Sequence, residues 1–172
     1  IYGFTPILAR MAFDGGANGI TVTFLRGILA IPLLFVLLKV KEIPLGLKGD
    51  WKAVLLVGLL GMSLTTILLY MSYNYLPVGM STTLHFTYPI LVTAACAIFF
   101  KEKINRWKIT ALILCSMGIA LFVDQVSSTG ITGITGMTLA LLSGATFSLY
   151  IIGIDRSQLR HMHYLKLTFY LN

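Results

Sequence analysis

Residues 78–100 read VGMSTTLHFTYPILVTAACAIFF, and this run contains no Asp, Glu, Lys or Arg. A helix needs about 20 mainly apolar residues to cross the hydrocarbon core of a membrane, which is about 30 Å thick. The strands of a membrane β-barrel would instead alternate apolar and polar residues over about ten positions. Because residues 78–100 show no such alternation, they predict a membrane-spanning helix.

Blocks of similar composition recur along the chain, at residues 20–38, 53–73, 109–123 and 134–154. The block at 109–123 is short for a span, but Trp107 and Val126 extend it. Over the whole chain 57% of the residues are hydrophobic and 11% are charged, whereas about a quarter of the residues of a soluble domain are charged. The sequence therefore predicts an all-α membrane protein, a polytopic helical bundle.

Both ends of the chain resemble partial spans. Residues 1–13 are about half as long as a span, and they do not begin with methionine. A further apolar segment starts at Tyr164 and runs to Asn172. We therefore expect a bundle that is truncated at both ends.

Basic residues are concentrated in alternate connections between the expected spans. The chain has 13 Lys and Arg against 6 Asp and Glu, a net charge of +7. Eleven of the 13 basic residues lie in three of the connections. The connection after the span at 20–38 contains Lys39, Lys41, Lys48 and Lys52, and the connection after 78–100 contains Lys101, Lys103, Arg106 and Lys108. The connection after 134–154 contains Arg156, Arg160 and Lys166. The connections at 14–19, 74–77 and 124–133 contain no Lys or Arg.

This asymmetry follows the positive-inside rule, which places the basic connections in the cytoplasm. We expect a multi-pass protein of the plasma membrane with these loops inside the cell. A nucleic-acid partner would require the charges to gather in one patch with stacking aromatic residues. Since the charges are dispersed among the spans, no nucleic-acid partner is expected.

Residues 124–133 are predicted to form the longest outer loop, because Ser and Gly are frequent from Ser127 to Gly136. The loop divides the chain into segments 1–126 and 134–172. Thr23-Phe24 recurs as Thr168-Phe169, at the start of the last expected span. A repeat of five spans has an odd number of crossings, so its second copy would be inverted. Inverted repeats are typical of secondary transporters.

Several short motifs occur together in a characteristic order. They are Thr23-Phe24-Leu25-Arg26, Gly58-Leu59-Leu60-Gly61, Tyr70-Met71-Ser72-Tyr73-Asn74-Tyr75-Leu76-Pro77, Gly79-Met80-Ser81-Thr82-Thr83-Leu84, Tyr88-Pro89-Ile90-Leu91, Phe99-Phe100-Lys101-Glu102-Lys103-Ile104 and Gly118-Ile119-Ala120-Leu121. This succession resembles the EamA domain of the drug/metabolite transporter superfamily.

The resemblance implies a ten-helix carrier made of two inverted five-helix repeats that works by alternating access. Residues 1–126 would be the first repeat, with its first helix incomplete, and residues 134–172 the start of the second. The family handles amino acids, metabolites, nucleotide sugars and drugs. The resemblance therefore implies a small metabolite, an amino acid-like compound or a drug as substrate, without naming one.

Two arginines lie outside the basic connections, Arg10 near the outer end of the first span and Arg26 about two turns into the second. An Arg near the centre of a membrane helix costs about 2.5 to 3.5 kcal/mol to insert, so it needs a reason to be there. Arg can hold a carboxylate with two parallel hydrogen bonds, which makes both residues candidates for the substrate path. Alternatively, they extend to the membrane surface or pair with Asp14.

His85 is the one histidine inside an expected span. Ser81, His85 and Tyr88 share a helix face, and Pro89 frees the carbonyl of His85 from its helical hydrogen bond. These four residues are candidates for the substrate path, and His85 could couple transport to protons. The alternative is a histidine that hydrogen-bonds a neighbouring helix and holds the bundle together.

Polar stripes run along two further spans. Ser63, Thr66, Tyr70 and Tyr73 form one, and Ser143, Thr146 and Tyr150 form the other. We take Thr66, Tyr70 and Tyr150 as candidates for the path, because they lie deep in their spans. Tyr73 and Tyr75 lie near the outer end, where an aromatic belt at the membrane interface is the expected role.

No residue pattern suggests a metal, a cofactor or catalysis. His161 and His163 are too few for a metal site, and Glu102 is expected to pair with Lys101, Lys103 or Arg106. Neither a P-loop nor a Ser/His/Asp arrangement occurs. The leading hypothesis is a secondary transporter that meets a small-molecule substrate and the lipid bilayer, and a homodimer is compatible with it. An intramembrane enzyme and a membrane scaffold or sensor remain as alternatives.

Overall fold

The computed structural model describes residues 5–47, 51–127 and 130–171, and every regular element in them is helical. The elements are α1 (Thr5–Asp14), α2 (Gly19–Val40), α3 (Trp51–Leu56), the π-helical η1 (Val57–Ser63), α4 (Leu64–Ser72), α5 (Val78–His85), α6 (Tyr88–Phe100), α7 (Arg106–Ser127), α8 (Gly130–Asp155), the 3₁₀ turn η2 (Gln158–His161) and α9 (Tyr164–Leu171).

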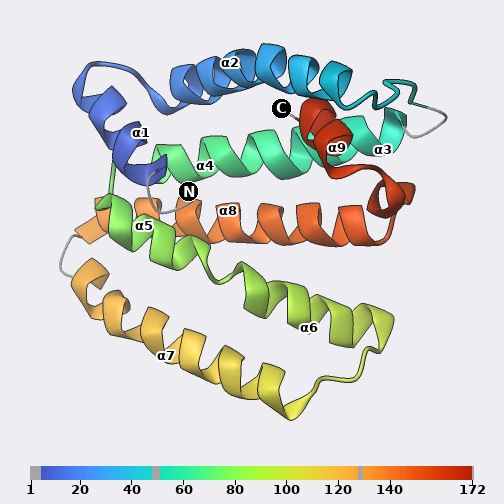
Figure 1. Cartoon of the computed structure of the whole chain (residues 1–172). Helices are drawn as coiled ribbons and strands as arrows, with labels where there is room; N and C mark the ends of the chain where they lie inside the picture. The colour runs from blue at the N-terminus through green and yellow to red at the C-terminus, as the bar shows by residue number, and fades with distance from the viewer. Residues whose placement is uncertain (1–4, 48–50, 128–129, 172) are drawn as a thin grey trace.

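The long helices lie side by side, with α8 in the middle of the bundle (Figure 1). On one side α8 packs against η1 and α4, and on the other against α5, α6 and α7. The α2 helix lies beyond α4, and α9 packs against α2, α3 and η1. The core of the bundle is therefore the set of contacts that α8 makes with its neighbours.

Four segments of the described residues are long and apolar enough to cross a membrane, namely Gly19–Val40, Trp51–Ser72, Val78–Phe100 and Gly133–Asp155. The helix α7, with 22 residues, occupies the place of the remaining predicted span. Large apolar side chains such as Phe24 and Leu29 of α2 are exposed, as the lipid-facing side of a span requires. The prediction of an all-α, polytopic membrane protein is confirmed.

The long outer loop predicted at 124–133 is largely helical instead. The helix α7 continues to Ser127 and α8 begins at Gly130, while Ser128 and Thr129 lie outside the described residues. A Cβ atom at Gly136 would lie 2.7 Å from side-chain atoms of Tyr75 and Leu76. Glycine is therefore needed there for close packing of α8 against the α4–α5 turn, as is common between membrane helices. The glycines were misread as loop residues.

The segment Val78–Phe100 is broken in its middle, where Phe86 and Thr87 form a turn between α5 and α6. Pro89 lies in the first turn of α6, where a helix does not need the N–H that proline lacks. The break is stabilised from both sides. The Phe86 carbonyl accepts a hydrogen bond from the Cys115 thiol of α7 (3.8 Å). The Ser148 hydroxyl of α8 shares its one proton between the carbonyl of Gly144 in its own helix (2.8 Å) and that of Tyr88 (3.2 Å).

The α8 helix approaches this break closely because it has a glycine there. A Cβ atom at Gly144 would lie 2.9 Å from the carbonyl oxygen of His85. A larger residue would push α8 away from the end of α5. Gly144 thus holds the broken span against the central helix.

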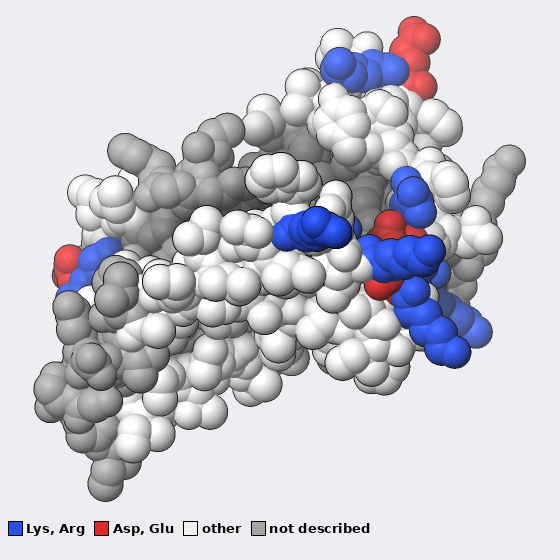
Figure 2. Space-filling model, turned by 90° about the horizontal axis from the view of Figure 1, so that it is seen from below, with Lys and Arg blue, Asp and Glu red and all other residues white. Residues whose placement is uncertain are grey.

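Charged side chains gather at one end of the elongated molecule, as Figure 2 shows for one face. Most Lys and Arg in that view lie at the end where α6 and α8 finish, and a small group of mixed charge lies at the other end. The flank between the two ends is almost free of charge in this view. This distribution agrees with the three basic connections lying on the same side of the bundle.

Candidate functional site

A cavity of about 560 Å³ lies among α2, α4, α5, the start of α6, and α8. Its volume is in the range of small-molecule binding sites. The lining residues are Arg26, Met62, Thr65, Thr66, Leu69, Tyr70, Tyr73, Thr82, His85, Phe86, Tyr88, Phe147 and Ile151. The cavity is therefore next to the break between α5 and α6.

Aromatic rings form two walls of the cavity. At the end of α4, the rings of Tyr70 and of Tyr73, the residue after the helix, lie 5.6 Å apart. On the other side, Phe147 of α8 lies edge-on to Tyr88 of α6 with 4.8 Å between the ring centroids, and 5.3 Å from His85. Rings in such arrangements leave faces and edges that can contact a flat ligand.

Arg26 is the one charged side chain among the described residues that line the cavity. It comes from α2, is half-buried, and donates a hydrogen bond from Nη2 to the Thr66 hydroxyl at 3.4 Å. Thr66 in turn donates to the carbonyl of Met62 (2.9 Å). No Asp or Glu of the described ranges forms an ion pair with Arg26. Since a guanidinium has five N–H donors, most of them remain open.

His85 is buried and is held by Ser143 of α8, with 2.9 Å between Nδ1 and the serine oxygen. The Ser143 hydroxyl also contacts the carbonyl of Ala140 at 2.6 Å, where it can only donate. Because a hydroxyl has one proton, the His85 Nδ1–H is the donor to Ser143. In the neutral form of the ring, the other nitrogen, Nε2, is then an acceptor.

The hydroxyl groups of three threonines take part in hydrogen bonds between helices. Thr82 donates to the carbonyl of Val78 (2.7 Å), so Tyr73 donates to Thr82 (3.3 Å) and links α4 to α5. Thr146 donates to the carbonyl of Ser143 (3.0 Å), so Thr65 donates to Thr146 (2.8 Å) and links α4 to α8. These hydroxyls therefore stabilise the frame of the cavity.

Five of the nine predicted site residues line this cavity together: Arg26, Thr66, Tyr70, His85 and Tyr88. Two more lie next to it. Pro89 follows Tyr88 in α6, and Tyr150 stacks on Phe147 with 5.4 Å between the ring centroids. A Cβ atom at Gly61 would lie 2.5 Å from the Cβ of Tyr150, so the Tyr150 side chain packs against η1.

The remaining two predicted residues lie away from the lining. Arg10 forms an ion pair with Asp14 at 3.2 Å, and both side chains are more than half exposed. Arg10 thus forms the ion pair with Asp14 that was the alternative to a place on the substrate path. Ser81 is fully buried beside α8, and its hydroxyl has no hydrogen-bond partner within the described part of the chain.

Thr82 and Phe147 are among the lining residues that were not predicted, and Tyr73 was assigned a wrong role. Only 2% of Tyr73 is exposed, so it is a cavity residue bonded to Thr82 and not part of an interfacial belt, whereas Tyr75 is 42% exposed. Thr82 precedes His85 by three residues, and Phe147 follows Ser143 by four. Residues at these spacings share a helix face, and this signal could have identified both.

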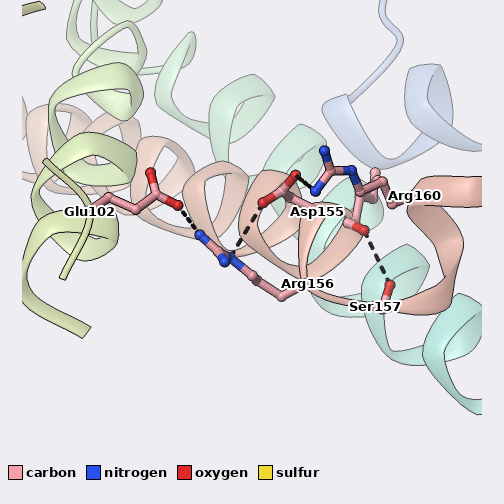
Figure 3. A network of polar contacts seen from close by, with 6 residues as sticks. Glu102, Asp155, Arg156, Ser157 and Arg160 are labelled. Carbon is pink, nitrogen blue, oxygen red and sulfur yellow. Dashed lines mark hydrogen bonds and ion pairs between the residues drawn. The ribbon is translucent and has the colours of Figure 1, made fainter. Parts of the chain in front are cut away.

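The basic end of the bundle contains a network of ion pairs (Figure 3). Arg156, just after α8, pairs with Glu102 and, at 3.3 Å, with Asp155, which also pairs with Arg160 at 3.6 Å. The guanidinium of Arg156 lies 4.0 Å from the centre of the Phe100 ring. Its side chain therefore joins the ends of α6 and α8.

The prediction that Glu102 pairs with a sequence neighbour is wrong. Lys101 adopts a left-handed conformation (φ 54°) and ends α6, and Glu102 beyond it points toward α8 (Figure 3). Within the described ranges, no three His, Cys, Asp or Glu side chains lie close enough to hold a metal ion.

Comparison with known proteins gives one match. The sequence model described as the EamA-like transporter family matches residues 1–124. No curated protein and no solved structure matches the chain. Since the matched residues make up well over half of the chain, it belongs to the EamA-like transporter family, whose members are multi-pass membrane transporters.

Proposed function

We propose that the protein is a secondary transporter that binds a small metabolite, an amino acid-like compound or a drug in the cavity among α2, α4, α5 and α8. The observation that carries this proposal is Arg26, a half-buried cation in a membrane span without a carboxylate partner among the described residues. Ionisable groups inside membranes are costly and are usually functional. A ligand that completes the hydrogen bonds of Arg26 accounts for its position.

Irregular helices on two sides of the cavity support a mechanism of alternating access. The α5–α6 span is broken at Phe86–Thr87, and the α3–α4 span contains the π-helical turn Val57–Ser63. Transporters often build substrate sites from broken helices, and π-helical turns are frequent at functional sites. Both spans could therefore bend next to a bound substrate.

The charge distribution supports an orientation in the plasma membrane. The connections after α2, after α6 and after α8 carry the basic residues, and the positive-inside rule would place them in the cytoplasm. The segments 1–126 and 134–172 would belong to two inverted repeats. In this arrangement the network around Arg156 lies at the cytoplasmic end and the Arg10–Asp14 pair at the outer end.

An intramembrane enzyme is less well supported than a transporter. Catalysis would require clustered acids, bases or nucleophiles, but among the described lining residues His85 is the one histidine, and neither Asp, Glu, Cys nor Lys lines the cavity with it. Its Nδ1 is already bonded to Ser143. His85 could still exchange protons during transport through Nε2, which would couple transport to a proton gradient.

The test is uptake and counterflow of a panel of labelled metabolites by the intact protein in proteoliposomes, compared for Arg26→Ala and Arg10→Ala. Arg10 is the matched control, because it is an exposed arginine outside the cavity. A hydrogen bond to a charged group contributes about 1.5 to 3 kcal/mol, so Arg26→Ala should lower transport about tenfold to a hundredfold. Arg10→Ala should stay near wild-type. Equal activity of both variants would contradict the assignment of the cavity.

A further inference from the structure

The charges around the cavity restrict what it can bind. Arg26 supplies one positive charge, and within the described residues neither Asp nor Glu lines the cavity. A ligand with a single negative charge would neutralise Arg26. An ammonium group would find no carboxylate on this lining and would be repelled by the guanidinium. The charges therefore favour an anion over a zwitterion or a cation.

The hydrogen-bond donors of the lining that have no partner also favour an anionic ligand. The three threonines among the described lining residues have already used their hydroxyl protons. Thr65 donates to Thr146, Thr66 donates to the carbonyl of Met62, and Thr82 donates to the carbonyl of Val78. The open donors are the other N–H groups of Arg26 and the hydroxyls of Tyr70 and Tyr88, which have no partner in the described part of the chain. An oxyanion supplies several acceptors to such donors.

The rest of the lining fits a flat, apolar body. The Tyr70–Tyr73 pair and the Tyr88–Phe147 pair provide the two aromatic walls, and Met62 and Ile151 add further apolar lining. Flat rings pack well against such walls by offset stacking or edge-to-face contact. Resting on the proposed transport function, we propose that the substrates are aromatic or similarly flat monoanions without an ammonium group, with the anionic group at Arg26.

Binding of labelled phenylacetate to the purified intact protein tests this proposal, with competitors that each change one property. Compared with phenylacetate, phenylacetamide has nearly the same shape but no charge, and phenylalanine has an additional ammonium group. Phenethylamine has an ammonium group in place of the carboxylate, and acetate has the carboxylate but no ring. We expect phenylacetate to bind about tenfold or more tightly than phenylacetamide and phenethylamine, since a hydrogen bond to a charged group is worth at least about tenfold. Phenylalanine keeps the carboxylate but should bind more weakly than phenylacetate, because its ammonium group would lose water without gaining a carboxylate partner on this lining. Acetate should also bind more weakly, because it has no ring to bury against the aromatic walls. Arg26→Gln should reduce the preference for phenylacetate over phenylacetamide to near one.

The outcomes separate this inference from the transport function. Equal or tighter binding of phenylalanine or phenethylamine, or no binding of phenylacetate, would overturn the inference even where vesicles transport another metabolite. Binding in the expected order without movement across the vesicle membrane would support the inference and contradict the transport function. If Arg26→Gln does not fold, as judged by its thermal unfolding, the competitor series on the wild-type protein decides by itself.

Discussion

The cavity and the basic end of the bundle each contain an arginine, but the surroundings of the two side chains differ. Arg26 makes one long hydrogen bond, 3.4 Å to the hydroxyl of Thr66. Arg156 pairs with Glu102 and Asp155 and lies over the ring of Phe100. The guanidinium of Arg156 is thus satisfied by the protein, while that of Arg26 retains open donors. Arg156, which has carboxylate partners on two elements, thus joins helices, whereas Arg26, which has none among the described residues, keeps donors that are available to a ligand.

The strongest test of this difference is to give Arg26 a carboxylate partner, as Arg156 has. Thr66→Asp would place a carboxylate beside the guanidinium, because the threonine oxygen is already within 3.4 Å of Nη2. The new ion pair would neutralise the cation and occupy its donors. Transport of the anionic substrate should then fall about tenfold to a hundredfold, which corresponds to about 1.5 to 3 kcal/mol, measured as initial uptake rates in proteoliposomes.

Thr66→Asn is the matched control, since asparagine has nearly the same shape as aspartate but carries no charge. We expect it to keep most of the transport activity. A loss of activity as large in Thr66→Asn as in Thr66→Asp would mean that the shape at Thr66 matters and not the pairing of Arg26. Normal activity of Thr66→Asp would remove the distinction between the two arginines.

His85 can be compared with the two arginines, because it too is held by a side-chain hydrogen bond, here to the buried Ser143. Ser143→Ala removes the acceptor of the His85 Nδ1–H, which is 2.9 Å away in the folded protein. A buried donor left without a partner costs about 1 to 3 kcal/mol. The free energy of unfolding should therefore fall by about that amount, measured by thermal unfolding of the protein in detergent.

The control is Ser116→Ala on α7. Ser116 is exposed, and within the described part of the chain its hydroxyl bonds only to the carbonyl of Leu112 in its own helix (2.8 Å). Its replacement should leave the midpoint of thermal unfolding nearly unchanged. Equal shifts for both variants would show that the His85–Ser143 bond does not contribute to the stability of the α5–α8 contact.

Much of the fold could be predicted because apolar length and charge placement are local properties of the sequence. The predicted block at 20–38 became the helix Gly19–Val40, and the block at 134–154 lies within Gly130–Asp155. The failure at 124–133 has a physical cause. Glycine permits both a loop and a close helix contact, and only the packing of Gly136 against Tyr75 and Leu76 distinguishes them.

The candidate site could be predicted in part, because helical spacing identifies residues that share a face but does not show which faces meet. Spacing grouped Thr66 with Tyr70, and both lie on the cavity with Arg26. It did not indicate that Phe147 of α8 would form the opposite wall. Nor could it indicate that Glu102 meets Arg156, since that contact depends on the turn at Lys101 and on the end of α8.

The smallest expected effect is at the basic end, where Glu102→Gln and Arg156→Gln test the other half of the comparison. The side chains of the Arg156–Glu102 pair are 36% and 45% exposed, and exposed ion pairs contribute little to stability. Each variant should lower the midpoint of thermal unfolding slightly, and the double variant should lower it no further than the single ones. In about 1 M salt the differences should disappear, because the Debye length is then about 3 Å.

Lys103→Gln is the matched control at this end, since Lys103 is exposed and forms no ion pair within the described ranges. It should leave the midpoint unchanged at low and at high salt. The affinity for the anionic substrate should stay at the wild-type value in all of these variants, because none of their side chains lines the cavity. A drop in affinity in Arg156→Gln comparable with that in Arg26→Gln would mean that both arginines act on the substrate. In that case the presence or absence of a carboxylate partner would not tell an arginine that joins helices from an arginine that binds the substrate in this protein.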